Sequence, residues 1–491
     1  VTPAVAGTAD FIASGTLPNG APVVLKADGT VEIATEVTTS TTTTGNEVLP
    51  IGSGLVFDTT GATGHVSISF DPSTSGKFVI AYKDYGAGGL GKVIIGTLSG
   101  TTLSFGSEHT FDATSNVEYV NVAFDPNTAG TFVLAYEKNI SGVNNGVAIA
   151  GTVSGTVITL SSTHTVLVPV VSAVGHRIDL AFDPNTTGSF VIAYGGRNGG
   201  TFASAIAGTI TGTTITSGTL VSCNSTYVSD IKVSFDPNTS GKFVLVYAKD
   251  GINAVVGTVS GNTVTFDTPV VVTADQTISV SIAFDPSTSG SFIIARSGPS
   301  YYGNLIAGTI TGTTLAFGSV VTFNSASTSN IDVSFDPNTA GKFVVVYKDG
   351  GNSYYGASVV GTVTGTSIIV GTSNVFNSIM TSYCSIAFDA FASGRFLVAH
   401  EASGVGKVLL GGLNETITTV TVAPTNLTST NFLGTSQAAY TDTQTATIML
   451  QGGISTNQTG LTIGSTYYVQ PDGTLSTTAG HPIVEAGKAL S

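Results

Sequence analysis

Residues 70–82 read Phe-Asp-Pro-Ser-Thr-Ser-Gly-Lys-Phe-Val-Ile-Ala-Tyr. The same phrase, Phe-Asp-Pro, a short Asn/Ser/Thr stretch, Gly, a spacer, then Phe and a β-branched run, occurs seven times, and its Asp residues are spaced by 54, 58, 53, 49, 51 and 53 positions. Self-similarity at such a period indicates a repeat architecture. The seventh copy departs from the others at Ala390 and Phe391. The copies begin at Phe70, Phe124, Phe182, Phe235, Phe284, Phe335 and Phe388.

One repeat is long enough for four short antiparallel strands. Residues 65–70, 77–82 and 92–98 are predicted strands, and residues from Leu103 to Phe111 form a fourth. The Asp-Pro and Gly between the first two strands predict a tight turn, because Pro fixes φ, Asp caps backbone N–H groups and Gly accepts a positive φ. Four antiparallel strands make one propeller blade, so the sequence predicts an all-β, seven-bladed β-propeller. An open β-solenoid is the competing interpretation.

The first strand carries two regular positions. One is polar in every copy, and the residue two positions later is always small, as at Ser67 and Ser69. Innermost strands crowd around a propeller axis, so small residues are expected there, and we expect the polar ring to face the channel or its water. The alternative, an ion site, is less favoured. The polar positions are Ser67, Asn121, Asp179, Lys232, Ser281, Asp332 and Ser385.

The chain ends predict ring closure and a second domain. Residues 52–58 match residues 106–112, a fourth strand, so the N-terminal segment is expected to supply the last strand of the last blade. Both ends contain an apolar strand followed by an Asp-Gly-Thr turn, at Asp28 and Asp472. We therefore expect one small β domain made from residues 1–34 and 425–491. A Thr-rich linker would span residues 35–46, and the propeller residues 47–424.

The terminal segments also carry a resemblance. Residues 17–31 contain Leu-Pro-Asn-Gly and Val-Leu-Lys-Ala-Asp-Gly-Thr-Val, and residues 460–475 read Gly-Leu-Thr-Ile-Gly-Ser-Thr-Tyr-Tyr-Val-Gln-Pro-Asp-Gly-Thr-Leu. These roughly hundred terminal residues resemble tail-fibre-type structural proteins of bacteriophages, particularly marine ones. The resemblance implies a virion part, often a homo-oligomer, in contact with other virion proteins. It brings no catalytic residue.

Charge and composition exclude several classes of function. The chain has 491 residues, a net charge of −14 and only 16 Lys and Arg, which are scattered singly. Nucleic acid and anionic membranes require clustered basic residues, so we expect neither a nucleic-acid partner nor membrane association. No apolar run is long enough to span a bilayer, so we expect no membrane insertion. The two cysteines, Cys223 and Cys384, fall in different repeats and are expected to be unbridged.

Catalytic and metal motifs are weak. Residues 86–92 have a GxGxxG spacing, but a strand rather than a helix is expected to follow, so a flexible loop is the better interpretation. The six histidines lack metal-ligand spacing, and one Asp per repeat is too few for calcium, so that Asp is expected to cap its turn. A sialidase-like site would need paired acids and an arginine cluster, which the sequence does not present. We therefore expect no catalytic residues, metal or cofactor.

Comparison of the seven copies separates two propeller faces. The turn that joins the first strand to the second and the turn that joins the third strand to the fourth hardly change among the copies. The other connections vary. The variable face is the expected binding face, because exposed Tyr beside Gly and Asn suits recognition. Its function is predicted to be host receptor or glycan attachment by a virion surface protein; a secreted bacterial adhesin or lattice protein and, more weakly, a glycan-cleaving enzyme are alternatives. The candidate binding residues are Tyr85, Arg197, Tyr301, Tyr302, Tyr354 and Tyr355.

Overall fold

The computed structural model divides the chain into two compact units. The propeller unit is Gly45–Glu415, and the end unit combines Val1–Thr44 with Thr416–Ser491. The structure describes residues 7–34, 38–42, 47–48, 54–59, 61–114, 117–140, 143–169, 177–196, 202–277, 279–413, 418–422, 426–428, 430–451, 454, 457–470, 473–479 and 483–490.

Each repeat forms an antiparallel ladder in chain order, with short turns between the strands. The first strands are β7 (Thr63–Phe70), β11 (Val117–Phe124), β16 (Arg177–Phe182), β21 (Asp230–Phe235), β26 (Val280–Phe284) and the second halves of β30 (Val321–Phe335) and β34 (Asn374–Phe388). The second strands are β8 (Lys77–Asp84), β12 (Thr131–Ile140), β17 (Ser189–Gly195), β22 (Lys242–Ala248), β27 (Ser291–Ser297), β31 (Lys342–Asp349) and β35 (Arg395–Ala402).

The outer strands complete these ladders. The third strands are β9 (Leu90–Ser99), β13 (Val143–Ser154), β18 (Ser204–Thr211), β23 (Ile252–Ser260), β28 (Tyr302–Thr311), β32 (Tyr355–Thr364) and β36 (Val405–Leu413). The fourth layer is β10 (Thr102–Asp112), then β14 (Val157–Leu160) with β15 (Thr165–Pro169), β19 (Thr214–Ser217) with β20 (Val221–Ser222), β24 (Thr263–Phe266) with β25 (Val270–Thr273), β29 (Thr314–Phe317) with the start of β30, and β33 (Ser367–Val370) with the start of β34.

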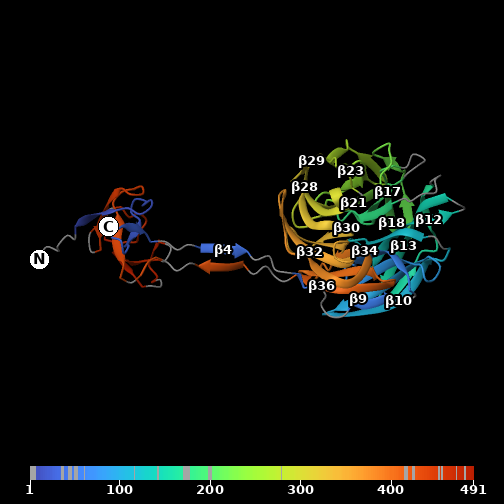
Figure 1. Cartoon of the computed structure of the whole chain (residues 1–491), viewed down its shortest axis with the longest axis horizontal. Coiled ribbons are helices and arrows are strands. Elements are labelled where there is room, and N and C mark those ends of the chain that lie inside the picture. Colours follow the sequence, from blue (N-terminus) through green and yellow to red (C-terminus); the bar gives the residue numbers. More distant parts are fainter. Residues whose placement is uncertain are drawn as a thin grey trace. The chain divides into compact units, whose positions relative to one another are not determined.

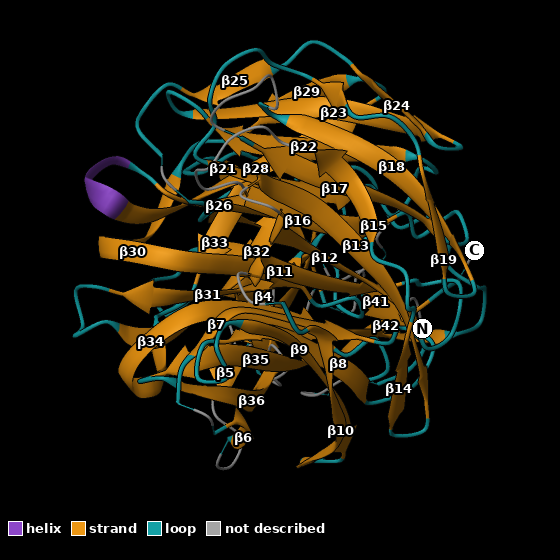
Figure 2. Ribbon diagram, turned by 90° about the vertical axis from the view of Figure 1, so that its right-hand side faces the viewer, coloured by secondary structure: helices purple, strands orange, loops and turns teal. Residues whose placement is uncertain are grey.

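The sheets follow one another around a ring (Figure 2). Four repeats have sheets of their own, while β30 and β34 each run from one repeat into the next and join the remaining three into one thirteen-stranded sheet. The first strands are neighbours in the order β7, β11, β16, β21, β26, β30, β34, and β34 returns to β7. A ring of antiparallel sheets with their first strands innermost is a β-propeller.

The ring is closed by residues that precede the first repeat. β6 (Leu55–Asp58) and β5 (Glu47–Val48) pair with β36, the third strand of the last repeat. Phe57 is 5% exposed, and its ring centroid lies 5.0 Å from that of Tyr82 in the first repeat. The predicted closing strand at residues 55–57 is therefore confirmed. It covers the sheet edge that the last repeat would otherwise expose.

The core of the propeller unit lies between neighbouring sheets. The second strands are buried along almost their whole length, which explains their continuous apolar runs such as Phe190–Tyr194. One such cluster packs Val133 of β12 against Leu180 of β16 and Ile192 of β17. Because every sheet is covered on both faces, each repeat depends on its neighbours for burial.

The end unit interleaves strands from both ends of the chain. One sheet has the order β1 (Thr8–Ile12), β39 (Thr445–Leu450), β38 (Phe432–Ser436), β2 (Pro22–Leu25), β3 (Val31–Ile33). Its core contains Leu17, Val23 and Ile448. A smaller sheet has the order β41 (Leu475–Ser476), β40 (Thr466–Val469), β42 (Glu485–Lys488). Residues from the N-terminal segment and from the C-terminal segment thus share one core.

The Thr-rich stretch that the sequence gives as a linker contains a strand. β4 (Thr38–Thr42) pairs antiparallel with β37 (Thr418–Val422), and Figure 1 shows β4 beside a strand from near residue 420. Both segments are rich in Thr and Val, and β-branched residues favour extended backbone. The two connections between the units therefore run side by side as a two-stranded ladder.

Candidate functional site

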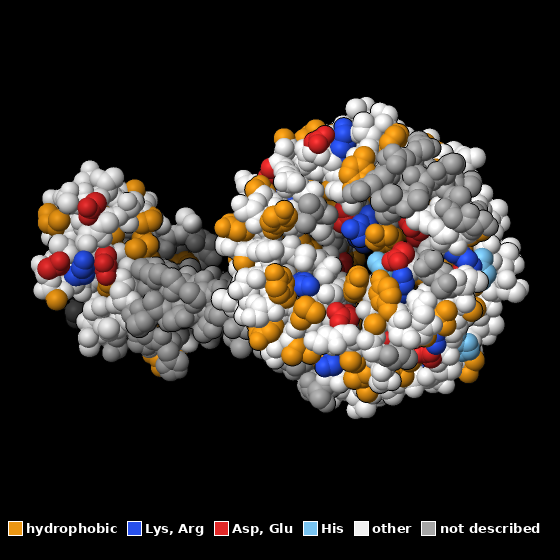
Figure 3. All heavy atoms as spheres, turned by 45° about the vertical axis from the view of Figure 1, so that its right-hand side comes forward, with side chains coloured by type: hydrophobic (Ala, Val, Ile, Leu, Met, Phe, Trp, Pro, Cys, Tyr) orange, Lys and Arg blue, Asp and Glu red, His pale blue; other side chains and the backbone are white. Residues whose placement is uncertain are grey.

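Side chains from every repeat meet at one end of the propeller axis. In every repeat, the residue two positions before the polar ring lines a cavity of about 150 Å³, here called the axial pocket. It opens on the face that carries the variable connections, and Figure 3 shows a hollow there with acidic, basic and histidine side chains around it. The residues at this position are His65, Tyr119, Arg177, Asp230, Ser279, Asn330 and Tyr383.

Four of these residues are held in the left-handed backbone region. The φ angles are 47° at His65, 51° at Tyr119, 50° at Asn330 and 53° at Tyr383. In each case the register with the second strand shifts at this point, as in a β-bulge that re-aims a side chain. A left-handed non-glycine residue costs ~1–3 kcal/mol, and such strain concentrates at functional sites. The bulges turn bulky side chains toward the axis at a cost in stability.

Beside the pocket, His65 of the lining forms a hydrogen-bonded group with Glu118 and Lys83. The Nε2 atom of His65 lies 2.6 Å from Oε2 of Glu118, and Nζ of Lys83 lies 2.5 Å from Oε1. Burial alone would raise the pKa of Glu118, but hydrogen bonds from His65 and Lys83 outweigh burial and lower the pKa to about 2. Tyr119 and Tyr383 flank the imidazole, with ring centroids 5.0 and 4.9 Å away. Glu118 is therefore a carboxylate at neutral pH.

Two further ion pairs complete the charged lining. The guanidinium of Arg177 lies over the ring of Tyr119, 4.7 Å from its centroid, and its Nε is 3.9 Å from Oδ1 of Asp230. Deeper in the channel, Nζ of Lys232 donates to Oδ1 of Asp179 at 3.0 Å. Burial would lower the pKa of Lys232, but the carboxylates around it raise the pKa above its ordinary value. Lys232 therefore remains charged.

The polar ring serves hydrogen bonding between repeats rather than channel solvation alone. Oγ of Ser67 accepts the backbone N–H of Val122 in the next repeat at 3.1 Å. The last repeat returns to the first, because the N–H of Ile68 donates to Oγ of Ser385 at 3.3 Å. These side chains satisfy N–H groups on the free edge of each innermost strand. The same kind of bond joins other neighbouring repeats: Asp179 accepts the N–H of Val233, Ser281 that of Val333 and Asp332 that of Ile386. Asn121 instead donates to the carbonyl of Ile178.

The constant face is occupied by a second set of bonds between repeats. Oδ1 of Asp183 accepts the N–H of Asn185 in its own turn at 2.9 Å, and Oδ2 accepts the N–H of Gly241 in the next repeat at 2.9 Å. The predicted turn cap is confirmed, and the second bond explains why the Asp and the Gly of this turn recur in the copies. Asp71, Asp125, Asp285 and Asp336 bond in the same two directions.

One predicted binding residue, Tyr85, contacts a residue of the axial pocket without itself lining the pocket. Tyr85 is 41% exposed, its hydroxyl lies 3.5 Å from Nε2 of His65, and Nζ of Lys83 lies 4.3 Å from its ring centroid. Arg197, which the sequence also suggests, lies outside the described residues. Tyr85 therefore stands at the rim of the group formed by His65, Glu118 and Lys83.

The other predicted tyrosines lie on two hairpins of neighbouring repeats. Tyr301 and Tyr302 follow β27 and are 52% and 41% exposed; Tyr354 follows β31 and is 53% exposed, while Tyr355 is partly buried. Tyr301 and Tyr354 have φ values of 64° and 62° within the two turns. None of the four lines the axial pocket. The hairpin tyrosines and the axial pocket are separate features of the variable face.

Sequence reasoning missed most of the axial pocket. His65, Tyr119, Arg177, Asp230 and Tyr383 differ in type from repeat to repeat, so no single motif marks them. A usable signal was present: each stands two residues before the polar ring position. A comparison of the copies at that offset would have placed all of them around one axis.

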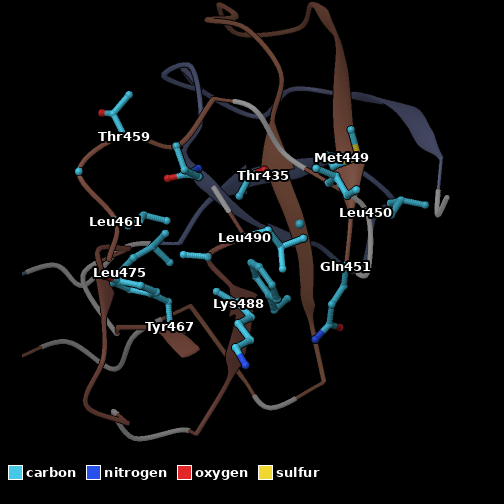
Figure 4. A pocket seen from close by; sticks show the side chains of 17 residues that line it. Thr435, Met449, Leu450, Gln451, Thr459, Leu461, Tyr467, Leu475, Lys488 and Leu490 are labelled. Atoms are coloured by element: carbon cyan, nitrogen blue, oxygen red, sulfur yellow. The ribbon is translucent and has the colours of Figure 1, made fainter. Parts of the chain in front are cut away.

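A second cavity lies in the end unit. It measures about 470 Å³ and lies among β38, β39, β40 and the C-terminal residues, with Phe432, Met449, Tyr467 and Leu490 in its apolar lining and Lys488 beside them (Figure 4). Its lining combines these apolar side chains with polar ones, among them Thr435, Gln451, Gln458 and Thr459. It draws on the end unit alone, whereas the axial pocket gathers a residue from each of the seven repeats, and we therefore rank it second.

The described part of the chain shows neither a metal centre nor a membrane-spanning helix. There, no group of three or more His, Cys, Asp or Glu is arranged to hold a metal ion. Over the same residues, no helix has the length and apolar character needed to cross a bilayer. Cys223 and Cys384 are both free thiols.

Comparisons with known proteins give likeness in fold only. No protein-family model matches the chain, and no curated protein does. One similar solved structure is Sqt1 of Saccharomyces cerevisiae, with 12% identity and a TM-score of 0.45; the match covers 83% of this chain and 99% of Sqt1. Another is the periplasmic gluconolactonase PpgL of Pseudomonas aeruginosa, with 11% identity and a TM-score of 0.46; the match covers 76% of this chain and 97% of PpgL. A Lactobacillus plantarum protein is 10% identical, with a TM-score of 0.47 and coverage of 63% and 84%. At these values the likenesses decide nothing, and the fold assignment rests on the strand pairing.

Proposed function

We propose that this chain is a non-enzymatic attachment protein, a seven-bladed β-propeller that binds a host-surface receptor or glycan through its variable face. The observation that carries the proposal is the axial pocket: side chains from every repeat converge on it, and four of them are held there by strained bulges. Strain of this kind persists when a site needs fixed side-chain directions. The opposite face is engaged in bonds between repeats and offers little that varies.

The axial pocket favours binding over catalysis. A general acid or base works best when its pKa lies near the operating pH. The pKa of Glu118 is lowered to about 2, so this carboxylate neither gives nor takes a proton readily at neutral pH. Asp230 is engaged with Arg177 and accepts the N–H of Val280 at 3.0 Å. Charged groups committed to one another orient a ligand but do not drive glycan cleavage.

The end unit is proposed to be one small β domain that attaches the chain to other virion proteins and supports a homo-oligomer. The support is the resemblance of both terminal segments to phage tail-fibre-type proteins, together with the interleaving of β1, β2 and β3 with β38 and β39. This proposal places the protein on the surface of a virion. A secreted adhesin or an extracellular lattice protein is the alternative that the same fold would serve.

Two experiments test these proposals. Antibodies against the purified chain should decorate phage particles in electron micrographs; decoration of a virus-free cell envelope would favour the adhesin. The purified full chain should bind selected glycans or host cells without releasing sugar products over a long incubation. Steady product release would overturn the non-enzymatic assignment, and absence of binding to any glycan or host cell would overturn the attachment role.

A further inference from the structure

We infer that the axial pocket takes a single neutral sugar residue, such as the end of a glycan chain. The inference rests on the proposed attachment function and specifies its ligand. Charge, size and surface chemistry of the pocket support it as three separate arguments.

Charge in the pocket is balanced locally. The acidic and basic side chains in the lining are His65, Arg177, Asp230 and Lys232. Arg177 and Asp230 face each other, while His65 has Glu118 as its partner and Lys232 has Asp179. An anionic ligand drawn to Arg177 would meet the carboxylate of Asp230 at the same place. Paired charges present dipoles and hydrogen-bonding groups rather than a net charge, which suits a neutral polar ligand.

A cationic ligand is disfavoured by the aromatic rings themselves. Tyrosine rings form cages for quaternary ammonium groups when their faces are open. Here Arg177 covers a face of Tyr119 at 4.7 Å, and Lys83 covers a face of Tyr85 at 4.3 Å. The protein's own cations thus occupy the positions that a ligand cation would take. A second cation would be repelled by them.

The size and polar lining suit one sugar ring. A volume of about 150 Å³ corresponds to the share of roughly five water molecules in liquid water. That is room for one small ring and not for a peptide strand. Arg177 beside Asp230 places a donor next to an acceptor, the pattern that adjacent sugar hydroxyls require, and Ser279 and Asn330 add neutral polar groups. The ring of Tyr383 offers apolar surface to the C–H groups of the sugar.

The test is calorimetric titration of the full-length chain with small probes. Methyl glycosides of the common neutral hexoses, 6-deoxyhexoses and N-acetylhexosamines are compared with sialic acid, a uronic acid and choline. The expected result is weak, saturable binding of at least one neutral glycoside and none of the charged probes. A variant that fills the pocket, Ser279→Phe, should weaken that binding at least tenfold. The matched control, Ser287→Phe, adds the same ring on the constant face and should leave binding unchanged; the melting temperatures of both variants verify folding.

The outcomes separate this inference from the proposed function. Binding of a charged probe that Ser279→Phe abolishes would overturn the neutral-sugar assignment and leave the attachment role standing. Binding to glycans or cells that Ser279→Phe does not change would place attachment elsewhere on the face and also overturn the inference. Absence of binding in every assay would overturn both.

Discussion

The ring of Phe243 covers Gly257 on the adjacent strand so closely that a Cβ atom at Gly257 would lie 2.1 Å from Cζ of the ring. The two residues are directly paired in the register of β22 and β23. Each repeat has the same pair of Phe and Gly between its second and third strands. The missing side chain of the glycine is therefore what makes room for the buried ring.

Replacing Gly257 with Ala should destabilise the propeller unit. The new methyl group would force the ring of Phe243 to move in a close-packed core, which costs about 1–3 kcal/mol. Urea denaturation at 25 °C measures the change in the free energy of unfolding. Gly371→Ala is the control, because its Cβ would meet only the carbonyl oxygen of Val360 at 3.4 Å. Equal stability of the two variants would contradict the proposed role of the ring.

Loss of a repeated aspartate should cost more than loss of one hydrogen bond. Asp183→Ala leaves the buried N–H of Gly241 and the part-buried N–H of Asn185 without their acceptor. Leaving a buried donor unsatisfied costs about 1–3 kcal/mol, and the loss of the second bond adds to this. We expect a loss of about 2–5 kcal/mol in the free energy of unfolding. Asp183→Asn keeps one acceptor oxygen and should lose roughly half as much. If the Asn and Ala variants have the same free energy of unfolding, only one of the two hydrogen bonds of Asp183 contributes to stability.

Truncation of Phe57 should weaken ring closure. Phe57 is buried against Tyr82 and Gly406, and Phe→Ala changes in cores cost about 3–5 kcal/mol. Val56→Ala on the same strand is the control, since Val56 is 36% exposed. Deletion of residues 47–58 should expose the edge of β36 and promote aggregation, detected by light scattering. An unchanged melting temperature after that deletion would show that closure does not depend on this segment.

The stability of the propeller unit should fall in mild acid because of His400. His400 is fully buried, and neither of its ring nitrogens has a hydrogen-bond partner among the described residues. Burial lowers the pKa of His400 to about 4, below the unfolded value of 6.5. The unfolded chain therefore binds the proton first as the pH falls. Stability is full above pH ~6.5 and declines toward pH ~4 by about 3 kcal/mol.

A substitution isolates this contribution. His400 stands where five repeats have Tyr and packs on Phe376, with a centroid distance of 5.2 Å. His400→Phe should remove this part of the pH dependence of the free energy of unfolding between pH 4 and 7. His109→Asn, a change at a partly exposed histidine, should leave it in place. Identical pH profiles for the wild type and His400→Phe would refute the assignment to His400.

The four hairpin tyrosines should contribute to attachment and not to folding. Replacing Tyr301, Tyr302, Tyr354 and Tyr355 together with Ala removes exposed aromatic surface, so cell or particle adsorption should weaken at least ~10-fold. Phe391→Ala is the control, because Phe391 is 52% exposed but lies on the constant face. The melting temperature should change little in both variants. Unchanged adsorption in the quadruple variant would remove these hairpins from the binding face.

The sequence predicted the repeat and its turns because both follow from local chemistry. The Asp-Pro turn, the positive φ of Gly76 and the alternation of the first strand each depend on a few adjacent residues. Closure by residues 55–57 was predictable because that segment matches a fourth strand elsewhere in the chain. These features are specified within single segments and need no knowledge of packing.

The axial pocket was not predictable in the same way. Its residues lie about fifty positions apart and, except for Tyr119 and Tyr383, differ in type. The bulges that turn His65 and Tyr383 inward depend on packing around the whole ring. The pairing of β4 with β37 was missed for a related reason: nothing in a low-complexity Thr stretch indicates which distant segment it pairs with. Of the binding residues that the sequence suggested and the structure describes, only Tyr85 contacts a residue of the pocket, His65.

The paired connections at β4 and β37, and at β5 and β36, mean that the chain enters and leaves the propeller at one place. The propeller is therefore an insertion between two paired strands, β4 and β37. Recombination that exchanges residues 45–415 for another closed ring would need to match only the two chain ends at this place. The end unit would keep its own core, which comes from both termini. Such an exchange would replace the whole propeller and leave the fold of the end unit unchanged.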